Sequence, residues 1–240
     1  TPSDTLDAFI EHYWTVVWRL PSGEDFIQET LPYPSVHVAF EPGNSEIVFA
    51  MQGRFTRHLI GQGRVFAIKF HPGGFFPFMQ AAQHCYLNKR LPVSEVWPDF
   101  PISEFESYIN TDSDELKLAE RLDEALCPRC PPPDENVARV NQLIDIITEA
   151  KGNIRSEALA RLGGMSLRTL QRLFAQYVGV SPKWVIQRIR LHDALERVQA
   201  QPESLTEIAM DLGYADQAHF TRDFKAVVGI SPREYLRGPS

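Results

Sequence analysis

The 240-residue chain contains only three cysteines and no His-x-His pair. Three cysteines cannot build the disulfide framework of a small secreted domain. The single histidines His37, His58, His71 and His84 are scattered, so they do not form the ligand cluster of a metal enzyme. No apolar run reaches the roughly 18 residues of a membrane span, and the N-terminus lacks the basic start and apolar middle of a signal peptide. We therefore expect a cytoplasmic protein that is not an enzyme and has no metal, cofactor or membrane partner.

Positive charge is also scarce, because 24 Lys and Arg face 31 Asp and Glu for a formal net charge of −7. This deficit would argue against a nucleic-acid partner if it were evenly spread. Residues 136–240, however, contain 14 basic and 11 acidic residues, whereas residues 1–135 contain 10 basic and 20 acidic ones. Such asymmetry indicates two domains with different partners, and the length is sufficient for two domains of ordinary size.

The stretch Ser204–Pro232 has the layout of a helix-turn-helix. Ser204 and Glu207 form a capping box at the start of a short helix, and Gly213 suits the left-handed conformation of a sharp turn. Asp216 then caps a second helix, whose core-facing residues recur at helical spacing: Phe220, Phe224, Val227 and Val228. The second helix of this motif usually enters the major groove of DNA.

The same pattern occurs twice. Leu170-x3-Phe174-x4-Gly179-x-Ser181-Pro182 aligns without a gap with Phe220-x3-Phe224-x4-Gly229-x-Ser231-Pro232, at an offset of 50 residues. An Ala-x3-Gly phrase precedes each copy, at Ala160–Gly164 and at Ala209–Gly213. A single copy would fit an ordinary helical hairpin equally well, but packing alone does not explain two copies in tandem.

The duplicated motif, with Gly213-Tyr214, Phe220, Phe224, Gly229 and Ser231-Pro232 in its second copy, resembles the DNA-binding domain of the AraC/XylS family of bacterial transcription regulators. The resemblance covers roughly residues 134–237. It implies a seven-helix domain whose two recognition helices enter successive major grooves on one face of the duplex. It also implies which positions contact bases, namely Arg168, Gln171 and Arg172 in the first helix and Gln217, Thr221 and Arg222 in the second.

Residue chemistry supports the pair Arg172 and Arg222 independently. Each lies two residues before a core phenylalanine and six residues after an N-cap, so the two positions are equivalent. Arginine can bind guanine with two hydrogen bonds. Lys225, one turn beyond Thr221, is expected to contact phosphate. Ala218 offers only a methyl group, so the second helix should read fewer bases. The alternative for each position is a solvated helix face.

The N-terminal part alternates short apolar stretches with Gly and Pro turns, which is typical of a sandwich or small barrel. Expected strands are 10–20, 25–31, 35–41, 46–52, 55–60 and 65–70, with turns at 42–44, 53 and 61–63. The aromatic segment 71–78 suits the mouth of an apolar pocket, or a plain loop packed on the strands. Helices follow, with inward residues at Ile102, Phe105 and Ile109, then Leu116, Ala119, Leu122 and Leu126 after the acidic stretch 112–115.

A Pro-rich connector at residues 127–133 marks the domain boundary. It contains Cys127 and Cys130, a Cys-x-x-Cys pair without the second pair that a zinc site needs. Asp134 caps the next helix, Asn153 or Ser156 caps the one after it, and a long helix runs from Ser181 to about Ala200 with Trp184, Ile189, Ala194, Leu195 and Val198 buried. We predict domains at 1–126 and 134–240.

The predicted fold is therefore α+β with two domains. A β-rich N-terminal domain, a cupin-like barrel or sandwich with trailing helices, precedes an all-α domain with two helix-turn-helix motifs joined by a long helix. By the resemblance, the chain is a sequence-specific DNA-binding regulator, more an activator than a repressor, controlled by a small-molecule effector. Implied partners are double-stranded DNA, a second copy of the chain and, for an activator, RNA polymerase.

Three alternatives stay open. One is a DNA-binding protein whose N-terminal domain only dimerises, and another is a redox-responsive regulator acting through Cys127 and Cys130. The third is a DNA-repair enzyme carrying the same helical module, which would need a clustered cysteine zinc site that this sequence lacks.

Overall fold

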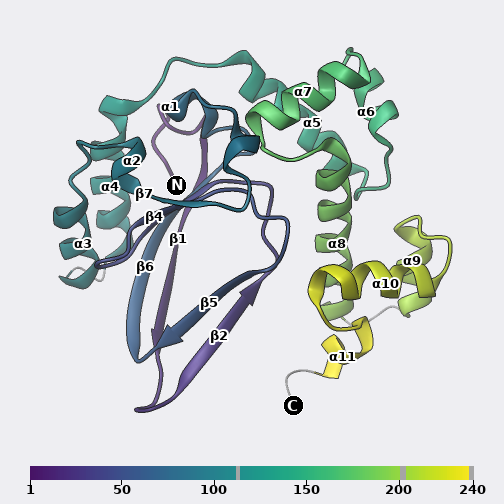
Figure 1. Ribbon diagram of the computed structural model, residues 1–240, viewed down its shortest axis with the longest axis horizontal. Helices are drawn as coiled ribbons and strands as arrows, with labels where there is room; N and C mark the ends of the chain where they lie inside the picture. The colour runs from purple at the N-terminus through teal and green to yellow at the C-terminus, as the bar shows by residue number, and fades with distance from the viewer. Residues whose placement is uncertain (112–113, 201–203, 238–240) are drawn as a thin grey trace.

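The computed structural model describes residues 1–111, 114–200 and 204–237. Figure 1 shows a β-rich N-terminal part followed by a helical C-terminal part, which confirms the predicted fold class. Residues 112 and 113 of the predicted acidic helix start, and residues 238–240 of the predicted C-terminal domain, lie outside the described residues.

The strands form two separate antiparallel sheets. The first has five strands in the order β1-β6-β3-β4-β7, and the second pairs β2 with β5. Among the described strands, no ladder joins the two sheets, so the arrangement is a sandwich and not a closed barrel. The bounds are β1 (Ile10–Arg19), β2 (Asp25–Thr30), β3 (His37–Phe40), β4 (Glu46–Val48), β5 (Phe55–Ile60), β6 (Gln62–Phe70) and β7 (Arg90–Pro92).

All six predicted strands are present, with three differences. β3 and β4 are shorter than predicted, and β7 was not predicted. β6 begins at Gln62, so Gln62 and Gly63 belong to a strand and not to a turn. The indole of Trp18 covers Gly63 so closely that a Cβ there would lie 2.2 Å from the ring. Only a glycine fits at position 63, because a Cβ there would clash with this ring. Gly61, two residues earlier, is favoured for a different reason, since its φ of +57° lies in the left-handed region.

The two faces of the five-stranded sheet have different neighbours, as the alternation of side chains along a strand requires. Val38, Phe40 and Ile68 face the main hydrophobic core, to which the N-terminal helices also contribute. Ala39, Val65 and Ala67 face the opposite side, together with Trp14 and Trp18. The N-terminal helices are α1 (Phe76–Met79), η1 (Gln83–Tyr86), α2 (Val93–Val96), α3 (Ile102–Thr111), α4 (Glu115–Leu126) and η2 (Cys127–Arg129).

The predicted inward face of α4 is wrong by half a turn at its start. Leu118, Leu122 and Leu126 are buried, whereas Leu116 is 73% exposed. Asp114 caps the helix, and two residues along a helix correspond to a rotation of about 200°. Leu116 and Leu118 therefore point in nearly opposite directions, and only the second matches the face that contains Leu122 and Leu126.

Seven helices make up the described C-terminal part: α5 (Glu135–Glu149), α6 (Ser156–Leu162), α7 (Leu167–Tyr177), α8 (Pro182–Ala200), α9 (Leu205–Asp211), α10 (Gln217–Val228) and α11 (Pro232–Arg237). The predicted caps Asp134, Ser166 and Asp216 each accept a backbone N–H hydrogen bond, and the capping box of Ser204 and Glu207 is complete. Neither Asn153 nor Ser156 caps α6, because Arg155 occupies that position without a side-chain bond. The side chain of Asn153 instead lies against Gly213.

The hydrophobic core is divided in a way that does not follow the predicted domains. One cluster contains residues of the sheet, of α3 and α4, and of α5 to α8 up to Ile189. A second cluster holds α9 and α10 on the last part of α8, from Leu191 to Val198. The first helix-turn-helix thus shares a core with the N-terminal part, while the second has its own. The boundary at residues 127–133 stays a prediction, and the first residues of this Pro-rich connector, 127–129, form a 3₁₀ turn.

Candidate nucleic-acid interface and apolar cavity

Helices α7 and α10 present the predicted base-contacting side chains. Arg168, Gln171 and Arg172 are exposed on α7, and Arg222 and Lys225 are exposed on α10. The core side chains Leu170, Phe174, Phe220 and Phe224 point the other way and are fully buried. Among the described residues, no carboxylate lies within 4.0 Å of the guanidinium groups of Arg168, Arg172 or Arg222. Within the described part of the chain, these side chains thus have no carboxylate partner that would compete with DNA.

Gln217 and Thr221 are less accessible than the others, since both are half-buried. The hydroxyl of Thr206 on α9 donates a hydrogen bond to Oε1 of Gln217, at 3.0 Å. The amide of Gln217 therefore helps to hold α9 against α10, and its freedom to reach a base edge is reduced. Its assignment to DNA contact stays a prediction.

Helix α8 sets the separation of the two motifs. Its 19 residues correspond to about 28 Å at 1.5 Å per residue. Figure 1 shows α7 near one end of α8 and α10 near the other. Successive major grooves on one face of DNA lie about 34 Å apart, so a modest bend of the duplex would bring both helices into contact.

The N-terminal part packs on the C-terminal end of α7. The imidazole Nδ1 of His84 lies 3.2 Å from the carbonyl oxygen of Ala175, and the rings of Phe76 and Tyr177 are 4.2 Å apart. Gly73, with φ of +83°, lies against Tyr177 and Val140. The segment 71–78 therefore contacts the C-terminal end of α7, and Arg168, Gln171 and Arg172 in its first two turns stay exposed.

A buried arginine joins the N-terminal part to α8. Arg188 is 2% exposed, and its Nη2 donates a hydrogen bond of 2.6 Å to the carbonyl oxygen of Gln52. Its guanidinium lies 4.3 Å from the centre of the Trp184 ring. Burial lowers the pKa of Arg188 to about 10, so the group is charged at neutral pH. Helical spacing predicted Trp184 as buried but gave no sign of Arg188, because the burial comes from a segment distant in sequence.

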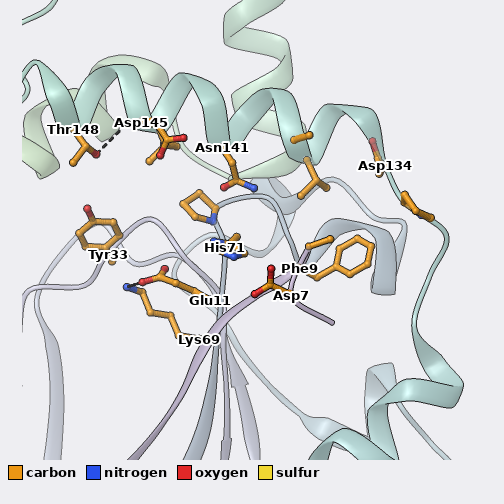
Figure 2. Close-up of a pocket in the computed structure, with 16 residues that line it drawn as sticks. Asp7, Phe9, Glu11, Tyr33, Lys69, His71, Asp134, Asn141, Asp145 and Thr148 are labelled. Atoms are coloured by element: carbon orange, nitrogen blue, oxygen red, sulfur yellow. Dashed lines mark hydrogen bonds and ion pairs between the residues drawn. The ribbon is translucent and has the colours of Figure 1, made fainter. Parts of the chain in front are cut away.

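A cleft of about 690 Å³ separates α5 from the start of β1. Figure 2 shows Asn141, Asp145 and Thr148 of α5 on one side and Glu11, Lys69 and Tyr33 on the other. Nζ of Lys69 lies 2.7 Å from Glu11 and 4.5 Å from the centre of the Tyr33 ring. Among the described residues, no group of three or more His, Cys, Asp or Glu is placed to hold a metal ion.

An apolar cavity of about 460 Å³ lies between the two sheets. Trp14, Trp18 and Val65 line it from the five-stranded sheet, and Phe55 and Leu59 line it from β5. Its polar lining comprises Gln28, Thr30, Ser35, His37, Glu46 and Arg57. No local pattern in the sequence indicates Ser35 or His37 as cavity residues, because the cavity depends on how the two sheets face each other.

The histidine of this cavity leads to a pH prediction. Burial, with Lys69 and His12 nearby, lowers the pKa of His37 to about 4 from 6.5. The unfolded chain therefore binds the proton more readily, so stability should be fully present above pH 6.5 and fall as the pH decreases towards 4, by about 1–3 kcal/mol. Urea unfolding at several pH values tests this. A His37→Gln variant should show a shallower decline between pH 6.5 and 5, and an unchanged slope would contradict the assignment.

Two exposed recognition helices fixed on one connecting helix define the chain as a tandem helix-turn-helix protein. Residues 159–238 match a family model described as a helix-turn-helix domain, and residues 1–92 match one described as a domain of unknown function, DUF6597. None of the helices in the described part of the chain is both long and apolar enough to cross a membrane.

The curated relatives match the C-terminal part. The HTH-type transcriptional activator RhaS of Escherichia fergusonii is 39% identical over 110 residues, which cover 44% of this chain and 38% of the relative. An uncharacterised HTH-type transcriptional regulator of Haemophilus influenzae is 33% identical over 98 residues, covering 41% and 33%. The match thus spans less than two-fifths of these relatives. These relatives are named as transcriptional regulators, and the C-terminal part of the chain is similar to them in its helix-turn-helix domain.

Solved structures resemble the chain in part or over most of its length. The C-terminal domain of AraT from Geobacillus stearothermophilus is 27% identical, with a TM-score of 0.40, and the match covers 42% of this chain and 85% of that one. ToxT from Vibrio cholerae is 12% identical, with a TM-score of 0.48, and the match covers 94% and 97%.

Proposed function

We propose that the protein is a sequence-specific DNA-binding transcription regulator, and an activator in preference to a repressor. The observation that carries the proposal is the exposure of Arg172 and Arg222 at equivalent positions of two recognition helices. An activator is favoured because several relatives of the C-terminal part are named transcriptional activators. RNA polymerase is then the expected protein partner at the promoter.

We further propose that a small molecule in the apolar cavity controls DNA binding. The segment between β4 and β5 supports this, because Met51 and Phe55 line the cavity while the carbonyl of Gln52 between them accepts the hydrogen bond of Arg188. Displacement of this segment by a ligand would remove the hydrogen-bond partner of a buried charge, which is costly. Occupancy of the cavity is thereby coupled to the position of α8, which holds both motifs.

A non-sensing N-terminal domain that only dimerises is the second candidate. The exposed apolar side chains Val17, Ile27 and Ile60 favour a homodimer, since they are 67%, 60% and 65% exposed and apolar patches of this kind often mark interfaces. Dimerisation and ligand control are compatible, because these side chains do not line the cavity.

The footprint on DNA tests the proposed function. One protomer should protect about 17–20 base pairs, and the protected site should be asymmetric because the two recognition helices differ in sequence. Hydroxyl-radical footprinting on sites selected from random DNA measures both properties. Protection of only half that length by each protomer would contradict simultaneous use of α7 and α10.

The linker cysteines give a prediction against redox control. Sγ of Cys127 lies 3.7 Å from the hydroxyl of Ser3, and Sγ of Cys130 lies 3.4 Å from the carbonyl oxygen of Thr5. Burial raises the pKa of Cys130, which disfavours the reactive thiolate. Replacing both cysteines by serine should therefore leave DNA affinity unchanged under oxidising and reducing conditions. A redox-dependent affinity that disappears in the double variant would favour the redox-responsive alternative.

A further inference from the structure

Two neighbouring polar side chains line the apolar cavity, and the hydroxyl of one of them has no hydrogen-bond partner among the described residues. Ser35 is 4% exposed, and its Oγ has no hydrogen-bond partner within the described residues. His37 lies two residues further along the chain and lines the same cavity. Buried polar groups in proteins almost always have partners, so an unpartnered hydroxyl on a cavity wall indicates a place where a ligand supplies one.

The contact with Trp14 fixes the tautomer of His37. Nε1 of Trp14 donates a hydrogen bond of 3.2 Å to Nδ1 of His37, and the two rings meet edge to face with centroids 5.9 Å apart. A neutral imidazole that accepts at Nδ1 carries its hydrogen at Nε2. His37 therefore offers a hydrogen-bond donor, and its neighbour Ser35 offers a hydroxyl that can donate or accept.

The formal charges of the cavity are already paired. Arg57 forms an ion pair with Glu41, and Nη1 of Arg90 lies 3.3 Å from Glu46. A charged ligand would thus have to bury its own charge without a free counter-ion, at a large cost in desolvation. The remaining lining is mostly apolar and includes the indoles of Trp14 and Trp18, which suit a flat, weakly polar molecule.

We propose that the cavity binds an uncharged, largely aromatic molecule whose oxygen accepts a hydrogen bond from Nε2–H of His37 and meets the hydroxyl of Ser35. The volume of about 460 Å³ lies within the usual range for small-molecule sites. This inference rests on the proposed function, because it defines the chemical class of the effector.

Three naphthalene derivatives of similar size separate the possible ligand classes. 2-Acetylnaphthalene carries a neutral acceptor oxygen, 2-naphthoate replaces it by a carboxylate, and 2-ethylnaphthalene has no acceptor. Ligand-detected NMR titration of the full chain, without DNA, measures the three dissociation constants. The ketone should bind most tightly, with the carboxylate at least about tenfold weaker because its charge is unpaired in the cavity.

Variants test the role of His37. His37→Phe keeps an aromatic ring but removes the donor, so it should weaken the ketone about 3- to 10-fold, as expected for one hydrogen bond, and leave 2-ethylnaphthalene unchanged. Ser35→Ala is a smaller change to the packing and should weaken the ketone as well. His58→Phe is the matched control, because His58 is exposed and does not line the cavity, and it should have no effect.

Two results would overturn the inference. One is tighter binding of 2-naphthoate than of the ketone, which would indicate an anion site at Arg57. The other is the absence of saturable binding for all three compounds at concentrations up to their solubility. Neither result affects the proposed DNA binding, which the footprint measures without any of these compounds. Conversely, if the ketone binds but no DNA footprint is found, the proposed regulator function is wrong and the inferred ligand site is still supported.

Discussion

Replacing Arg172 by alanine should weaken binding to the specific DNA site by about 1–3 kcal/mol and relax base preference at one position. The guanidinium is exposed on α7 and has no carboxylate within 4.0 Å among the described residues, so the variant removes a DNA contact without releasing an internal ion pair. Arg168 and Gln171 are also exposed on this helix. The first recognition helix therefore offers three long polar side chains to the groove.

Arg222→Ala and Lys225→Ala provide the comparison. Arg222→Ala should weaken binding to the specific DNA site less than Arg172→Ala does. The reason is that Ala218 contributes only a methyl group and Gln217 is hydrogen-bonded to Thr206. Lys225→Ala should weaken all DNA sequences alike and reduce the salt dependence by about one unit. Competition binding against single-base variants of the site, at several salt concentrations, distinguishes these effects. Loss of specificity with Arg222→Ala but not with Arg172→Ala would show that α10 is the dominant reader.

Phe224→Ala should destabilise the second helix-turn-helix by about 3–5 kcal/mol, the usual cost of removing a buried phenylalanine. Phe224 is fully buried, and its ring lies 5.7 Å from Phe220 and 5.9 Å from Tyr235, measured between centroids. The small cluster that contains it is separate from the main core. We therefore expect α9 and α10 to unfold at a lower temperature while the rest of the chain stays folded.

Phe174→Ala is the matched control at the equivalent position of the first motif. Its side chain belongs to the core shared with the N-terminal part, so it should lower the main unfolding transition. Calorimetry should show a split transition for Phe224→Ala and a single displaced one for Phe174→Ala. The footprint of Phe224→Ala should also shorten at one end. A uniform shift of one transition in both variants would contradict two separate cores.

The sequence predicted the helix-turn-helix pair well because its signals are local. The capping box at Ser204, the N-cap Asp216 and the left-handed Gly213 act on neighbouring backbone groups, and the structure has all three. The exposure of Arg172 and Arg222 follows from the buried positions of Phe174 and Phe224 two residues later. In the N-terminal part, the alternation of short apolar stretches with Gly and Pro turns is also a local signal, and all six expected strands are present.

Features that depend on distant segments could not be predicted in this way. Arg188 is buried because Gln52, 136 residues earlier, reaches it. β7 forms by pairing with β4, and three residues are too few for a recognisable pattern. Ser35 and His37 gain their importance only when the second sheet encloses them. The phase error at Leu116 shows the same limit, since the apolar residues of α4 fit two faces until the packing selects one.

Helix α8 belongs to both cores, and this constrains how related chains can diverge. One inserted residue would lengthen the helix by about 1.5 Å and rotate everything after it by about 100°, which would take Leu191 and Ala194 out of their cluster. Four inserted residues would nearly restore the phase but separate the motifs by a further 6 Å or so. Insertions and deletions in α8 should therefore be eliminated by selection. New target sites would arise by exchanging side chains on α7 and α10, at an unchanged spacing between the two DNA segments.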